Sequence, residues 1–174
     1  FSRLGLGQST GVGFPGESTG LLPMKERWRP IEVATMSYGY GLSVTALQLA
    51  QAYAVLGSGG IKHQTSLLKL NGNHNSDDDG YVDRVMDESV AADVLAMIEK
   101  VTGDKGTARR AKVPGYRVGG KTGTVHKASA NGGYEDHKYT ALFAGVAPID
   151  NPRIALVVVV DDPKGDQYYG GRNW

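Results

Sequence analysis

The chain has no cysteine, little excess charge and no long apolar run. The absence of cysteine among its 174 residues excludes disulfides, thiol catalysis and zinc–thiolate sites. A net charge of +1, without a basic stripe, does not indicate nucleic acid as a partner. The four histidines lack a metal-ligand spacing, and we predict neither a metal nor a cofactor. The apolar run at 154–160 is too short to span a bilayer and suits a strand buried on both faces.

Glycine is abundant by contrast, and the glycine-rich residues 119–124 (Gly-Gly-Lys-Thr-Gly-Thr) allow two interpretations. With Gly115 they fit the phosphate-loop pattern G-x-x-x-x-G-K-[ST], and an apolar strand ending at Asp161 gives that interpretation weak support. A phosphate loop must lead into a helix, because the helix amino terminus holds the phosphates. The eleven residues 123–133 contain three glycines and no helical period. A nucleotide-binding protein is therefore the remote alternative.

As a strand, the same residues carry Lys121-Thr122-Gly123, a tripeptide used by serine acyl-transfer enzymes. Lys121 then projects from one face, Thr122 lies on the opposite face, and Gly123 leaves room for a substrate. Residue types and turn signals predict three strands in a meander, over 116–125, 139–146 and 154–160. Their connections are a polar segment at 126–137, with a turn signal at 131–133, and a tight turn at 148–152.

Two helices are predicted before the strands. Thr45 and Gln48 form a capping box, and the helix that they open ends at Gly57. A second helix starts near Asp87 and ends at Gly103, with an apolar stripe of Val90, Val94, Leu95, Ile98 and Val101. We expect no periodic element in the first 35 residues, and a solvated surface turn at 71–80. The chain is thus predicted to be one α+β domain, an antiparallel sheet packed with helices.

Several segments together resemble the transpeptidase domain of class B penicillin-binding proteins, closest to the division-specific type called penicillin-binding protein 3. The segments run in the family's order through nearly the whole chain and cover 13–23, 37–45, 106–110, 113–124, 143–148 and 162–171. The resemblance implies a penicillin-binding/β-lactamase-like α/β/α fold and an enzyme that cross-links peptidoglycan stem peptides in septal cell-wall synthesis. It also implies acylation by β-lactams, division proteins as partners, and a place on the periplasmic face of the bacterial inner membrane.

The resemblance also implies roles for individual residues. Lys121 corresponds to the motif lysine, near the substrate carboxylate and the serine network. Thr122 and Thr124 offer hydroxyls to that carboxylate, and the Thr124 N–H forms half of the oxyanion hole. His126 and the pair Tyr168 and Tyr169 are expected to line the pocket, although the two tyrosines fit core packing equally well.

The family's two upstream motifs are expected to lie outside this chain. Ser66-Leu-Leu-Lys69 fits the nucleophile pattern S-x-x-K, but its residues alternate as in a strand, whereas the nucleophile needs a helix. Ser129-Ala-Asn131 fits the pattern S-x-N, but it follows Lys-Thr-Gly instead of preceding it. We interpret both as coincidental matches, and place Phe1 downstream of the true motifs.

The carboxy-terminal end also departs from the family pattern. Residues 172–174 (Arg-Asn-Trp) stand where the family continues into a final helix that covers one face of the sheet. We therefore expect residues 1–174 to be the carboxy-terminal portion of one transpeptidase domain, with Leu156 and Val158 exposed or covered by another chain. The alternative is a non-catalytic fragment or interaction module.

Overall fold

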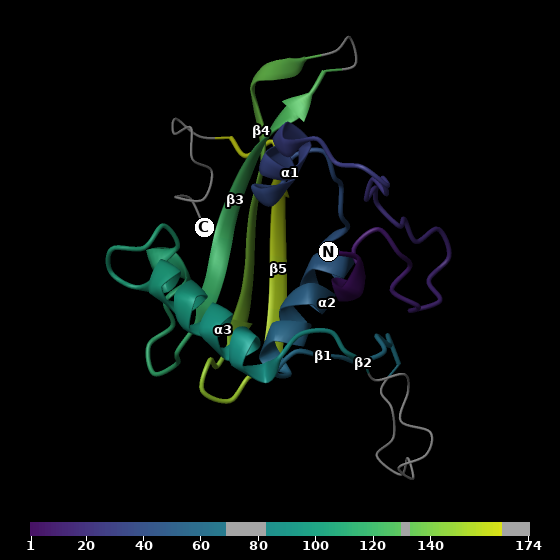
Figure 1. Cartoon of the computed structure of the whole chain (residues 1–174). Coiled ribbons are helices and arrows are strands. Elements are labelled where there is room, and N and C mark those ends of the chain that lie inside the picture. The colour runs from purple at the N-terminus through teal and green to yellow at the C-terminus, as the bar shows by residue number, and fades with distance from the viewer. Residues whose placement is uncertain (69–82, 130–132, 165–174) are drawn as a thin grey trace.

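The computed structural model describes residues 1–68, 83–129 and 133–164 (Figure 1). The three α-helices lie within residues 30–102 and the strands of the larger sheet within residues 119–161, as the α+β prediction requires. The elements in chain order are η1 (Ser2–Leu4), α1 (Pro30–Ser37), α2 (Ala46–Gly57), β1 (Ile61–Lys62), β2 (Asp83–Arg84), α3 (Glu88–Thr102), η2 (Arg109–Ala111), β3 (Gly119–Ala128), β4 (Tyr134–Ala147) and β5 (Ile154–Asp161).

The predicted meander is confirmed as an antiparallel sheet with the order β3-β4-β5. Its boundaries differ from the prediction, because β3 begins at Gly119 and the connection after it is shorter than 126–137. His126 pairs with Tyr139 and, beyond a register irregularity, Ala128 pairs with Tyr134. Pairing between β3 and β4 thus continues through residues whose polarity suggested a loop. Of the predicted turn, Asn131 and Gly132 lie outside the described residues.

The capping box at the start of α2 is confirmed. The Thr45 hydroxyl accepts a hydrogen bond from the Gln48 N–H at 3.1 Å, and the Gln48 side chain accepts one from the Thr45 N–H at 2.9 Å. The helix ends at Gly57, as predicted. The second predicted helix is α3, which begins after Asp87 and ends at Gly103.

The apolar stripe predicted on α3 is partly wrong. Ala91 and Leu95 are buried, but Val90 is 47% exposed. The buried face follows Ala91, Leu95 and Thr102, so it is rotated from the predicted stripe by about one position. A small residue, Ala91, and a polar one, Thr102, join Leu95 in this contact, which hydrophobicity alone does not reveal.

Helix α1 was missed, since the first 35 residues were expected to hold no regular element. Pro30 occupies its first position, where the absent N–H costs nothing. The Glu32 carboxylate accepts a hydrogen bond from the Arg29 N–H at 3.0 Å and pairs with Lys25 at 2.6 Å. This short helix is therefore held by polar contacts at its start, while its large apolar residues Ile31 and Val33 are exposed.

Residues 66–68 do not form the strand that was predicted for this stretch. The Ser66 hydroxyl accepts a hydrogen bond from the Leu68 N–H at 3.1 Å and lies 3.0 Å from the Leu68 oxygen, which makes a local turn. Lys69 and the acidic run at 71–80 lie outside the described residues. Ser66 is in neither a helix nor a strand.

Helices α2 and α3 cover one face of the sheet (Figure 1). A Cβ on Gly119 would lie 3.1 Å from α3, and one on Gly57 would lie 3.4 Å from Val146. Alternation along the strands therefore turns odd-numbered β3 residues toward the helices and even-numbered ones away. We call these the helix face and the open face of the sheet.

The prediction that residues 154–160 form a strand buried on both faces is wrong for β5. Leu156 pairs with Gly145 and Val158 with Phe143, on the open face, and they are 49% and 37% exposed. Among the described residues, no helix covers that face. Leu156 and Val158 are thus exposed in the structure of this chain, which is one of the two outcomes expected for them.

The side-chain amide of Gln48 connects α2 to the irregular amino-terminal segment. Gln48 is fully buried, and its Nε2 donates hydrogen bonds to the Gln8 oxygen at 2.6 Å and the Thr19 oxygen at 2.8 Å. Together with the capping bonds to Thr45, these contacts satisfy the buried amide. One polar side chain therefore ties two separate parts of the irregular segment to α2.

Gln48→Ala should destabilise the fold by about 2–3 kcal/mol, because it removes the hydrogen bonds that a fully buried amide makes to the backbone of Gln8, Thr19 and Thr45. Urea unfolding followed by circular dichroism measures the change. The control is Gln64→Ala at an exposed position, expected within about 0.5 kcal/mol of the wild type. Equal stability of the two variants would contradict this role for Gln48.

Candidate active site at the free edge of the sheet

Strand β3 is an edge strand that carries the Lys-Thr-Gly residues. Its only hydrogen-bonded neighbour within the described residues is β4, so its other edge is open. Lys121 is exposed and, being odd-numbered, lies on the helix face with Gly123. Thr122, Thr124 and His126 lie on the open face. Lys121 and Thr122 thus occupy opposite faces, as predicted.

The register fixes which backbone groups of β3 are available to a ligand. The Asp162 N–H donates to the Tyr139 oxygen at 2.9 Å, so the backbone of Tyr139 points toward β5. Backbone direction alternates along a strand, so the neighbouring residue Thr140 points toward β3. Thr140 pairs with Val125, and Val125 therefore bonds to β4.

The same alternation along β3 turns Thr122 and Thr124 the other way. Their N–H and C=O groups point to the free edge, where β4 does not use them. Two further contacts agree with this assignment. The Lys121 ammonium donates to the Thr122 oxygen at 2.8 Å, and the Thr102 hydroxyl donates to the oxygen of Val118, another even-numbered residue. The Thr124 N–H thus points to the free edge, where β4 does not use it.

The turn after α3 brings a further hydroxyl to this edge. Thr107 Oγ1 lies 3.2 Å from Thr122 Oγ1, within hydrogen-bonding distance. The Ala108 N–H donates to the Val101 oxygen at 2.9 Å, which folds the turn back onto α3. Gly106 permits that approach, since a Cβ there would lie 1.9 Å from the Val101 oxygen. Thr107 was not among the predicted site residues. The one signal for it in the sequence is that it lies in 106–110, a segment that carries the family resemblance.

His126 stacks against its cross-strand partner. The centroids of the His126 and Tyr139 rings are 4.6 Å apart and the rings are tilted by 60°, on the open face. His126 therefore shares a face with Thr122 and Thr124, two to four residues along the strand. Tyr168 and Tyr169, the other predicted pocket residues, lie outside the described residues.

Ion pairs fix both ends of the sheet around this edge. Arg117 binds Glu99 of α3 through two hydrogen bonds of 2.6 and 2.7 Å, and these bonds hold the pKa of the Glu99 carboxyl below its usual value. At the other end, Lys127 lies 2.8 Å from Asp161, and hydrogen bonds from Lys127 and Thr140 lower the pKa of that carboxyl. Both acids thus stay ionised at neutral pH.

The phosphate-loop interpretation is wrong, because Thr122 lies within β3 and opens no helix. Ser66 is not on a helix, so Ser66-Leu-Leu-Lys69 does not have the arrangement of a nucleophile motif. The described residues contain no cluster of His, Asp and Glu that could hold a metal. None of the described helices is long and apolar enough to cross a bilayer.

These features define a class of site: an edge strand that presents two outward N–H groups, threonine hydroxyls and a lysine, and that can pair with an extended ligand. Residues 1–173 match the family described as penicillin binding protein transpeptidase domain, and the chain belongs to that family. The division-type resemblance is confirmed by 47% identity to the peptidoglycan D,D-transpeptidase FtsI of Escherichia coli K12, over 98% of this chain.

Solved structures agree with this assignment. The transpeptidase domain of Burkholderia pseudomallei penicillin-binding protein 3 is 44% identical, with a TM-score of 0.88 over 98% of this chain. Mycobacterial penicillin-binding protein 3, solved with ampicillin, is 35% identical with a TM-score of 0.82 and covers 93% of this chain. The present chain spans 28% of the length of E. coli FtsI and 50% of the Burkholderia domain.

Gly106→Ala should destabilise the chain by about 1–3 kcal/mol, since the new methyl group collides with backbone. It should also separate Thr107 from Thr122. Thermal unfolding measures the first effect, and the NMR chemical shifts of the two threonines report the second. Gly103→Ala is the matched control, because its backbone is extended and the nearest atom would be 3.2 Å away. A larger effect at Gly103 than at Gly106 would refute this account of the turn.

Proposed function

We propose that this chain supplies the Lys-Thr-Gly wall of a peptidoglycan D,D-transpeptidase that acts in septal cell-wall synthesis and is acylated by β-lactams. The observation that carries the proposal is the outward direction of the Thr122 and Thr124 backbone at the free edge of β3. Membership of the transpeptidase family supports it. The mycobacterial relatives solved with ampicillin and aztreonam support the β-lactam part.

The chemistry is acyl transfer through a serine. Its hydroxyl oxygen attacks the carbonyl carbon of the penultimate D-Ala, and the terminal D-Ala leaves as an amine that takes up a proton. An amine of a second stem peptide then attacks the ester, forms the cross-link and releases the serine hydroxyl. The Thr124 N–H stabilises the oxyanion, while Thr122, Thr124 and Lys121 bind the substrate carboxylate. Gly123 keeps the strand accessible to the ligand.

The nucleophile belongs, in this proposal, to the part of the domain that precedes residue 1. Residues 1–174 are then the carboxy-terminal portion of the domain, and a helical S-x-x-K and an S-x-N from the preceding portion complete the site. His126, Tyr168 and Tyr169 are proposed to line the pocket. By family, division proteins are the partners, and the site faces the periplasm from the bacterial inner membrane. A non-catalytic role is the alternative outcome.

The Thr124 N–H can be removed without breaking the sheet, because it points to the free edge. Proline is tolerated at edge positions where the N–H does not pair. We predict that Thr124→Pro folds but reacts with a fluorescent penicillin about 100- to 1,000-fold more slowly. The protein for this test is a complete domain that joins the preceding half of the Burkholderia domain to this chain, and labelling is followed on a denaturing gel.

Thr124→Ala is the matched control, since it keeps the N–H and removes only the side-chain hydroxyl and methyl group; it should lose less activity than Thr124→Pro. Penicillin labelling of Thr124→Pro at the wild-type rate would show that this N–H is no oxyanion donor. A folded wild-type domain that takes no label would instead refute the transpeptidase proposal and favour the non-catalytic alternative.

A further inference from the structure

The turn that carries Thr107 is strongly basic. Residues 103–118 contain five basic residues and one acid, Asp104. Two of the five are neutralised, Lys112 by Asp104 at 3.0 Å and Arg117 by Glu99 at 2.6 Å. The other three, Lys105, Arg109 and Arg110, are exposed, and their side chains make no ion pair within the described residues. We call these three residues the basic ridge.

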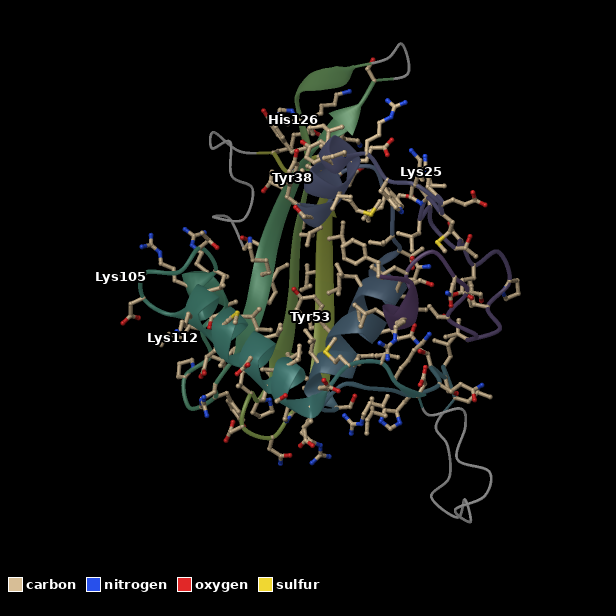
Figure 2. All side chains as sticks on the ribbon, in the orientation of Figure 1. Lys25, Tyr38, Tyr53, Lys105, Lys112 and His126 are labelled. Atoms are coloured by element: carbon tan, nitrogen blue, oxygen red, sulfur yellow. The ribbon has the colours of Figure 1, made fainter. Side chains whose placement is uncertain are left out.

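The basic ridge is fixed beside the free edge of β3. Thr107, within the same turn, lies 3.2 Å from Thr122 through its hydroxyl, and Ala108 is bonded to Val101 of α3. Each residue of chain spans at most about 3.6 Å, so the ridge Cα atoms lie within about 11 Å of the Cα of Thr107. Figure 2 shows Lys105 at the outer side of this turn, pointing away from the sheet.

The dipole of α3 explains only part of the positive charge of the ridge. Cations near the carboxy terminus of a helix are stabilised by its dipole, and Lys100 already occupies the last turn of α3. That effect also reaches this turn, because the Ala108 N–H bonds to the Val101 oxygen in the last turn of α3. At exposed positions it contributes only about 0.3–1 kcal/mol per cation, so it does not explain why Arg109 and Arg110 stand together without an acid. Two unpaired arginines side by side repel each other unless an anion joins them.

We propose that the basic ridge binds carboxylates of an acidic stem peptide, other than the terminal carboxylate, while that peptide lies along β3. This inference rests on the proposed function and adds a specificity element to the same site. Arginine suits carboxylates because its planar guanidinium donates two parallel hydrogen bonds. At physiological salt the attraction between exposed charges is screened beyond about 8 Å, so only a ligand bound close to this turn experiences the ridge. An anionic membrane would meet the same charge, but the ridge adjoins the peptide-binding edge, which favours the peptide.

The test uses the complete joined domain and two synthetic stem peptides. One peptide carries its natural side carboxylates, and the other has them converted to amides. Arg109→Gln/Arg110→Gln should lower kcat/KM for the acidic peptide about three- to tenfold, as expected for exposed ion pairs. It should leave the amidated peptide and the rate of penicillin labelling unchanged. Raising the salt concentration should remove the difference between the two peptides in the wild type.

Arg27→Gln/Arg153→Gln is the matched control, because it removes the same charge from two exposed arginines outside the ridge. It should leave the preference for the acidic peptide intact. An equal loss with both peptides, or an equal loss in the control, would overturn the proposal. Sedimentation with anionic phospholipid vesicles measures in addition whether the domain binds a membrane through the ridge. Ridge-dependent binding to vesicles, with unchanged peptide kinetics, would also overturn it and assign the ridge to a membrane.

Failure of this inference differs from failure of the proposed function. If the wild-type domain is labelled by penicillin but the two peptides react equally, only the ridge proposal falls. If the folded wild-type domain takes no label and processes neither peptide, the transpeptidase proposal falls as well. Glutamine at exposed positions should change stability by no more than about 0.5 kcal/mol, and circular dichroism confirms that the variants fold.

Discussion

One-sided pairing of β3 is the constraint on which the candidate site depends. An edge strand keeps every second N–H and C=O free, and the register with β4 decides which ones. In this chain the free set belongs to Thr122 and Thr124. A shift of one residue would turn Lys121 to the open face and direct the backbone of Gly123 outward. The register with β4 therefore decides which backbone groups the proposed site can present to a ligand.

Several contacts hold that register. Gly120 and Gly145 pair across the strands, and a Cβ on either would collide with the Phe143 ring at 2.4 or 2.8 Å. The glycines thus let Phe143 lie flat across the sheet on the open face. On the helix face, α3 meets β3 at Gly119, while Thr102 and Thr107 bond to the free edge at Val118 and Thr122. Helix α3 and the turn after it therefore position the free edge of β3 in addition to covering the sheet.

The sequence predicted the elements with strong local signals and missed those that depend on long-range contacts. The capping box of Thr45 and Gln48, the glycine stops and the three strands are confirmed. The length of β4 and the exposed position of Val90 were not anticipated, because cross-strand pairing and helix rotation are set by tertiary partners. Helix α1 is an exception, since Pro30 and the contact between Arg29 and Glu32 are local signals that the prediction overlooked. The positions of Lys121 and Thr122 followed from strand alternation. Thr107 could not be found by spacing, since a turn anchored on α3 brings it to Thr122.

Amide hydrogen exchange along β3, measured by NMR on the chain, tests the central claim most directly. Amides bonded to β4 exchange slowly, whereas amides at the free edge exchange fast. The account predicts slow exchange for Lys121, Gly123 and Val125 and fast exchange for Thr122 and Thr124. The opposite alternation would mean that the Thr124 N–H is used by the sheet, and the free edge of β3 would then present no oxyanion donor at that position.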